Sequence, residues 1–168
     1  MNLNQLVALV FILVILGIGT VGLTVLLDVV FARWVRRASA SVAQMPIRSA
    51  VVGAINFVFF SVIAFVVFAI AQELDKGSSR ELSVILRFWG ALIILVLASF
   101  VALGIAASAR WLGERIAPEK NALRQSITGI VVLELACFAP LVGWIVVPLA
   151  AMLVGYGAVI IALVWRRE

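Results

Sequence analysis

The sequence predicts an all-α fold, a polytopic bundle of transmembrane helices in a single integral membrane domain over residues 1–168. Hydrophobic residues make up 65% of the chain, and the mean hydropathy is +1.26. Four stretches contain no charged residue and are each longer than the roughly 20 residues that cross a bilayer as a helix: 1–27, 49–72, 88–109 and 135–165. We expect five spans, or four plus a C-terminal helical hairpin, with a further interfacial helix on the cytoplasmic side.

The first expected span covers residues 5–28. Its apolar run is longer than the core of a signal peptide, no basic residue precedes it, and no convincing small-residue cleavage site lies before Asp28. We therefore interpret this segment as a retained transmembrane helix.

Residues 31–45 have the periodicity of an amphipathic helix. At 100° per residue one face is apolar and the other basic: Phe31, Trp34, Val35, Ala38, Val42 and Met45 on the first, and Arg33, Arg36 and Arg37 on the second. We predict an interfacial helix that binds anionic lipid headgroups or an acidic cytoplasmic partner. The alternative is a positively charged stop signal that lies flat against the protein's own bundle.

The second and third spans are expected over residues 49–72 and 87–110. A short polar turn over 73–81 separates them, and Ser78 with Glu81 has the spacing of a capping box for the third helix. Trp89 and Trp111 bracket the third span, as expected of interface anchors.

The last third of the chain contains two further helices. Residues 125–165 carry a single charge, Glu134, and are broken by Pro140 and Gly143, which favour a turn. We expect spans over 121–139 and 141–165. A re-entrant hairpin that returns without crossing is the alternative.

The distribution of basic residues predicts the orientation. With five spans, ten lie on the cytoplasmic side and three outside, whereas four spans give eight and five. The ten are Arg33, Arg36, Arg37, Arg48, Arg110, Arg115, Lys120, Arg124, Arg166 and Arg167, and the three are Lys76, Arg80 and Arg87. We expect an N-terminus outside and a C-terminus in the cytoplasm.

Several classes of function are disfavoured by composition. The net charge of +5 fits orientation and headgroup attraction in a membrane protein, so we expect no nucleic-acid partner. There is no His and only one Cys, Cys137, which disfavours His or multi-Cys metal sites and catalytic His pairs. We expect no cofactor, no metal and no enzymatic activity. Acidic residues at span ends, such as Asp28 and Glu114, are expected to form solvated pairs with neighbouring basic residues.

Glu134 is the one charged residue that the five-span arrangement places deep in lipid, which makes it a functional candidate. Four polar residues fall at a similar depth, roughly 12 to 17 Å from the cytoplasmic end of their own span: Thr20, Asn56, Ser99 and Tyr156. Such a polar layer would form a proton or cation path, or simply join helices by hydrogen bonds of about 0.6 kcal/mol each.

Small residues four positions apart favour close helix packing in the third and last spans. The pairs are Gly104 with Ser108 and Ala151 with Gly155. We expect them to contact a neighbouring helix, within the chain or in an oligomer.

The C-terminal part resembles the multi-span membrane modules of bacteria and archaea that are associated with bactofilin-type polymer-forming proteins. The resemblance rests on Pro140 to Trp144, on Gly155 to Ala158 and, more loosely, on Pro46 to Gly53, and it covers about the last 120 residues. The soluble β-helical polymer domain of the fused forms is missing here. What the resemblance implies is a prokaryotic cytoplasmic membrane and an anchoring or organising role without catalysis.

We therefore expect a small membrane scaffold, anchor or accessory subunit. Its partners would be the lipid bilayer, anionic headgroups, and another membrane protein or further copies of the chain. The alternative function is a homo-oligomeric transporter or channel for ions, protons or small solutes that uses Glu134.

Overall fold

The computed structural model describes residues 2–77, 80–137, 139 and 142–164. Within these residues the fold is all-α and contains no strand. The helices are α1 (Leu3–Val30), α2 (Ala32–Gln44), α3 (Pro46–Asp75), α4 (Arg80–Ile116), α5 (Ala122–Cys137) and α6 (Val142–Val164).

Four of the described helices are long and apolar enough to cross a membrane, judged by length and composition: Asn4–Val30, Pro46–Asp75, Arg80–Ile116 and Ile145–Val164. The chain is therefore a multi-pass membrane protein by this criterion. Helix α5 has 16 residues, or about 24 Å at 1.5 Å per residue, which is short of the roughly 30 Å hydrocarbon core. A fifth span over 121–139 stays a prediction.

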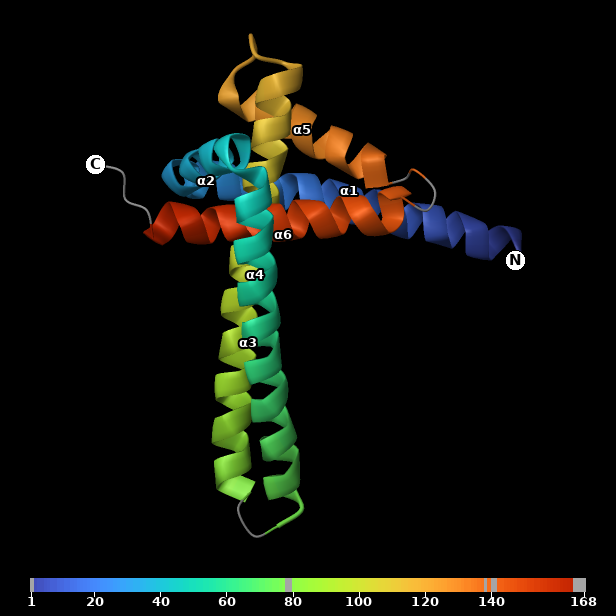
Figure 1. The fold of residues 1–168 in the computed structure, drawn as a ribbon. Coiled ribbons are helices and arrows are strands. Elements are labelled where there is room, and N and C mark those ends of the chain that lie inside the picture. The colour runs from blue at the N-terminus through green and yellow to red at the C-terminus, as the bar shows by residue number, and fades with distance from the viewer. Residues whose placement is uncertain (1, 78–79, 138, 140–141, 165–168) are drawn as a thin grey trace.

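Helices α3 and α4 form a long antiparallel hairpin (Figure 1). Pro46 occupies the first turn of α3, where its missing N–H breaks no helical bond. The two helices are joined at the far end, where the Ser83 hydroxyl donates to the Ala71 carbonyl at 2.9 Å and Arg87 pairs with Asp75 at 2.6 Å. Ser78 and Ser79 lie outside the described residues, and with them the predicted capping box.

Helix α6 contacts α4 through the small residues that the sequence singles out for close packing. A Cβ added to Gly104 would overlap the backbone of Gly155, and the Ser108 hydroxyl donates to the Ala151 carbonyl at 3.3 Å. The expected close packing within the chain is confirmed.

Helix α6 contacts α3 in the same manner. A Cβ on Gly53 would overlap the carbonyl of Leu153, and a Cβ on Gly157 would overlap the carbonyl of Ser49. Along α3 the contact shifts from Ser49 with Gly157 to Gly53 with Leu153, so α6 runs against α3 where they touch. Along α4 it shifts from Gly104 with Gly155 to Ser108 with Ala151, so α6 also runs against α4. Because α3 and α4 run in opposite directions, α6 is parallel to neither and lies across both (Figure 1).

Helix α5 packs on the last turns of α4, where a Cβ on Gly113 would overlap Gln125 and one on Gly129 would overlap Ala109. Helix α1 contacts α4, α5 and α2 but none of the described residues of α3 or α6. Within its most apolar stretch no residue is buried. Like α6, it lies across the hairpin, and its N-terminal part extends away from the other helices (Figure 1).

Helix α2 covers the crossing of α4 and α6. The core of the molecule lies here and consists of small side chains from these three helices: Val35, Ala38, Val42, Ala106, Ala107, Ala158, Val159 and Ala162. The arginines predicted on the opposite face, Arg33, Arg36 and Arg37, are exposed.

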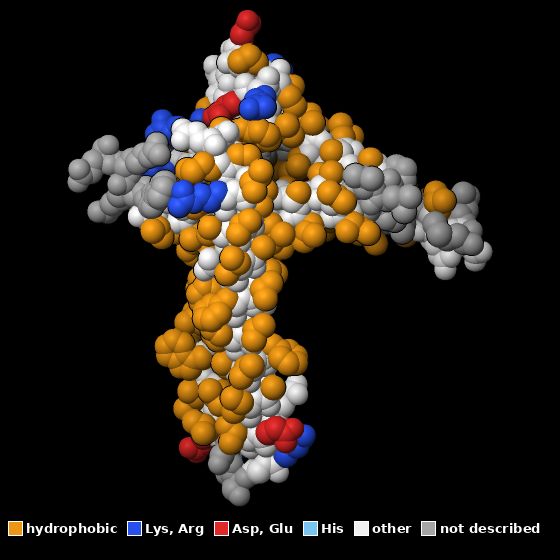
Figure 2. Space-filling view, in the orientation of Figure 1, with side chains coloured by type: hydrophobic (Ala, Val, Ile, Leu, Met, Phe, Trp, Pro, Cys, Tyr) orange, Lys and Arg blue, Asp and Glu red, His pale blue; other side chains and the backbone are white. Residues whose placement is uncertain are grey.

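Charged side chains gather at the two ends of the hairpin (Figure 2). One group surrounds α2 and the end of α4, the other lies at the turn between α3 and α4, and hydrophobic side chains cover the surface between them. This surface is the one expected to face lipid.

Candidate functional site

A buried polar network joins four helices, α1, α2, α4 and α5. The Arg110 guanidinium donates from Nη1 to Oδ1 of Asp28 at 2.8 Å and from Nε to Oε1 of Glu114 at 2.9 Å. The Ser126 hydroxyl donates to Oδ2 of Asp28 at 2.6 Å, and the Ser39 hydroxyl donates to Oε2 of Glu114 at 3.2 Å. Residues of α1, α2, α4 and α5 thus share one set of hydrogen bonds.

Burial makes this network different from a surface ion pair. Asp28 is 5% exposed and Arg110 is 8% exposed. The expectation of a solvated pair at Asp28 is therefore wrong. Close contacts of α4 with α5 at Gly113 and Gly129 bring the helices together around these charges. Glu114 keeps 39% of its side chain exposed and fits the expectation better.

The local sequence explains how the charges meet. Asp28 lies in the last turn of α1 after a long uncharged run, and Arg110 follows the uncharged run of α4. Each residue is the first charge after the long uncharged run of its helix, at the end of the helix that lies near α2. Each is costly to bury alone, and their attraction in a dry environment offsets part of that cost.

Glu134 lies on α5 next to α1. Its Oε2 would be 3.3 Å from a Cβ on Gly17, so the missing side chain of this glycine makes room for the carboxyl group. Its Oε1 is buried and has no hydrogen-bond partner among the described residues. Beside it is a pocket of about 470 Å³ whose other lining residues are all on α1: Val10, Leu13, Val14, Gly17, Ile18 and Val21.

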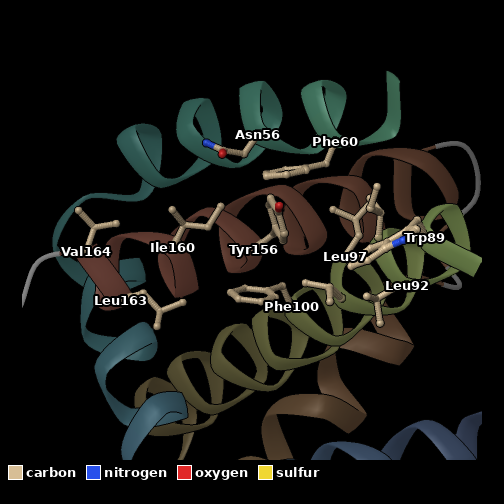
Figure 3. A pocket seen from close by; sticks show the side chains of 12 residues that line it. Asn56, Phe60, Trp89, Leu92, Leu97, Phe100, Tyr156, Ile160, Leu163 and Val164 are labelled. Atoms are coloured by element: carbon tan, nitrogen blue, oxygen red, sulfur yellow. The ribbon is translucent and has the colours of Figure 1, made fainter. Parts of the chain in front are cut away.

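Asn56 and Tyr156 line a different pocket, of about 390 Å³, between α3, α4 and α6. Figure 3 shows Tyr156 of α6 between Phe60 of α3 and Phe100 of α4. The ring of Tyr156 makes an edge contact with Phe100 at a centroid distance of 6.3 Å, and the Asn56 amide donates to the Val52 carbonyl of its own helix at 3.1 Å. Most other walls of this pocket are aliphatic.

The remaining members of the predicted polar layer bond within their own helices. The Thr20 hydroxyl donates to the Leu16 carbonyl, and the Ser99 hydroxyl donates to the Leu95 carbonyl, each at 2.8 Å. The structure therefore brings Asn56 and Tyr156 together but places Glu134 in a second pocket. Equal depth along separate spans does not bring residues together when the helices cross.

The arginines of α2 face away from the core that the helix covers. The apolar face of α2 packs against α4 and α6, so its hydrophobic residues are used inside the protein. Trp34 and Phe31 stay partly exposed, at 38% and 42%. This arrangement is the one that the stop-signal interpretation describes, and lipid binding by the exposed arginines stays a prediction.

In the described part of the chain, no group of three or more His, Cys, Asp or Glu side chains is placed to hold a metal ion. Cys137 is a free, half-buried thiol. Comparison of the chain with family models, with curated proteins and with solved structures finds no match.

Proposed function

We propose that the chain is a small, non-enzymatic scaffold, anchor or accessory subunit of a membrane assembly. The observation that carries this proposal is the closed network of Asp28 and Arg110. Its buried charges are paired with one another and with the Ser126 hydroxyl. Charges used in this way hold helices together and are not free to bind a solute.

The exposed surface of α1 supports a partner within the membrane. Its N-terminal half carries large exposed side chains such as Val7, Phe11 and Leu16, at 59%, 65% and 66%. A partner helix or a second copy of the chain packed here would cover a surface that the protein's own helices leave open.

The proposed location is the cytoplasmic membrane of a prokaryote, with the α2 side of the molecule in the cytoplasm. The excess of basic residues at that end supports this orientation. The exposed arginines Arg33, Arg36 and Arg37 are then at the height of the headgroups, where each contributes about 1 kcal/mol of attraction to anionic lipid.

Photo-crosslinking in native membranes tests the scaffold proposal. A photoreactive amino acid replaces Phe11 on α1 or, as a control, Phe65 on the hairpin, which is also exposed at 75%. We expect a defined protein adduct, to a second copy or to one other membrane protein, from position 11 only. Lipid adducts alone at both positions would contradict the proposal.

A second candidate function is transport of protons or cations through Glu134. The unpaired buried Oε1 beside the pocket on α1 favours it. Flux through the reconstituted protein that Glu134→Gln abolishes would establish transport, because an amide cannot titrate. Absence of flux with the wild-type protein would remove this candidate.

A further inference from the structure

The α3–α4 hairpin has the length and the charges of a complete bilayer crossing. Arg48 and Asp75 are 27 residues apart on α3, or about 40 Å of helix, and Arg80 and Arg110 are 30 residues apart on α4, or about 45 Å. A bilayer with its headgroups is about 40–45 Å thick. The hairpin therefore runs from one headgroup region to the other, with charged side chains at each end (Figure 2).

Helix α6 meets this hairpin close to one end. Ser49 and Gly53, its contacts on α3, lie one and five residues beyond Arg48, or about 2 and 8 Å deeper. Gly104, its contact on α4, lies six residues before Arg110, or about 9 Å deeper. Because α6 lies across both helices, its whole length stays near this depth and does not follow the hairpin to its far end.

Helix α2 gives an independent measure of the same depth. Its apolar residues Val35 and Ala38 are buried against α4 and α6, and its arginines are exposed on the other side. Helix α6 therefore lies beneath α2, on the side away from the arginines. One helix diameter is about 10 Å, which agrees with the depth obtained from the hairpin.

Helix α1 is held on the same side of the bilayer by its C-terminal end. Asp28 pairs with Arg110, and from there α1 runs across the hairpin and away from it (Figure 1). No residue of its most apolar stretch is buried, and the helix carries no charged residue before Asp28 and has hydrophobic side chains on every side. Such a helix belongs in hydrocarbon and is not an amphipathic surface helix.

We infer that α1 and α6 lie within the leaflet on the arginine side instead of crossing the bilayer, and that the protein consequently prefers membranes in which this leaflet is convex. At 28 and 23 residues the two helices are about 42 and 35 Å long and, at about 10 Å diameter, occupy roughly 770 Å² of that leaflet. Of the described helices, the opposite leaflet accommodates only the α3–α4 hairpin. The molecule is therefore a wedge.

This placement gives the same distribution of basic residues between the two sides of the membrane as five spans do. No charged side chain precedes Asp28, so moving α1 into one leaflet leaves the ten-to-three count unchanged. The two arrangements differ in the N-terminus, which five spans put outside and the wedge puts on the arginine side. The wedge follows from helix directions and charge positions, and it holds whether or not the chain has a protein partner.

Depth measurements with spin labels test the placement in the full chain reconstituted in phosphatidylcholine and phosphatidylglycerol vesicles. Single cysteines are introduced in a Cys137→Ser background at exposed positions: Val7, Phe11 and Ile18 on α1, Ile145 and Leu149 on α6, and Val51, Val58 and Phe65 on the hairpin as controls. We expect nearly equal depths along α1 and along α6, and steps of about 10 Å between the hairpin labels. Depths along α1 that pass through the bilayer centre would overturn the inference.

Membrane tubes pulled from giant vesicles of the same lipids test the curvature preference. The labelled full chain is used in vesicles whose outer surface carries the α2 side, checked by reaction of an Arg33→Cys variant with an impermeant reagent. We expect the protein to be denser on the tube than on the vesicle, and depleted from the tube when the orientation is reversed. Equal density in both orientations would overturn the preference, even if the depths are as expected.

Discussion

Removing Arg110 should destabilise the protein far more than removing the surface ion pair at the far end of the hairpin. In Arg110→Met the Asp28 carboxylate keeps the Ser126 hydroxyl at 2.6 Å but loses its cation at 2.8 Å. Breaking a buried pair in this way costs about 3–5 kcal/mol. Arg87→Met removes the pair with Asp75, whose side chains are 46% and 39% exposed, and should cost at most about 1 kcal/mol.

The partner variants separate pairing from simple loss of a side chain. Asp28→Asn leaves Arg110 its bond to Glu114 at 2.9 Å, and Glu114 reaches the surface, so the cost should be about 1.5–3 kcal/mol, that of a hydrogen bond to a charged group. The double variant Asp28→Leu, Arg110→Met removes both charges. It should recover much of the loss of Arg110→Met, because an apolar pair often replaces a buried ion pair without penalty.

Free energies of unfolding can be measured in mixed micelles with increasing sodium dodecyl sulfate, followed by tryptophan fluorescence. The reasoning is refuted if Arg110→Met costs less than about 1 kcal/mol, the range of solvated pairs. A single Asp28→Leu variant completes the cycle. The reasoning is also refuted if the double variant is as unstable as the sum of Asp28→Leu and Arg110→Met, because residues in direct contact should not act independently.

Three further outcomes are expected. Gly104→Leu should lower the free energy of unfolding by at least about 1–3 kcal/mol, because its side chain would overlap α6. Gly19→Leu is the control: nothing lies within 4 Å of its Cβ, so the free energy of unfolding should change by less than about 0.5 kcal/mol. Equal losses in the two variants would contradict the crossing of α4 and α6. If Glu134 is structural, Glu134→Gln should leave folding and partner association nearly unchanged, and Glu134→Leu should lower the free energy of unfolding by about 1 kcal/mol or less. Unfolding and copurification measure these effects. A Glu134→Gln variant that does not fold or does not associate with its partner would contradict this role. A synthetic peptide of residues 31–45 should bind vesicles more tightly when they contain anionic lipid. Circular dichroism during a lipid titration measures this binding. Equal binding to neutral vesicles would rule out headgroup recognition.

The positions of the helices could be predicted from the sequence, but their directions could not. Uncharged runs determine where a chain can enter lipid, so the helix from Pro46 to Asp75 contains the predicted span 49–72. Helix α6 has apolar residues on all sides, so no face of it indicates what it packs against. The small-residue pairs, Gly104 with Ser108 and Ala151 with Gly155, indicate close contact with some neighbouring helix, but their spacing names no partner and is compatible with more than one crossing angle.

The candidate site was predictable only in part for the same reason. Glu134 stood out because a charge in an apolar run is costly, and the structure does place it in a pocket with its Oε1 unpaired. In sequence, Asp28 and Arg110 lie 82 residues apart and look like ordinary end-of-span charges. Their pairing depends on α1 and α4 meeting at one point, which depth along each helix cannot show.

The place of α6 in the core also dictates an order of assembly during synthesis. Of the core residues, Ala158, Val159 and Ala162 belong to the last described helix, and they pack against Val35 and its neighbours from the beginning of the chain. The ion pair of α1 with α4 and the bond to Ser126 on α5 can form as soon as α5 has entered the membrane. The nascent protein should therefore pass through a stage in which α1 to α5 are already packed together but the contact surface for α6 is uncovered. A chain stalled or cleaved before Val142 would leave Ala38, Ala106 and Ala107 without the α6 residues that pack against them.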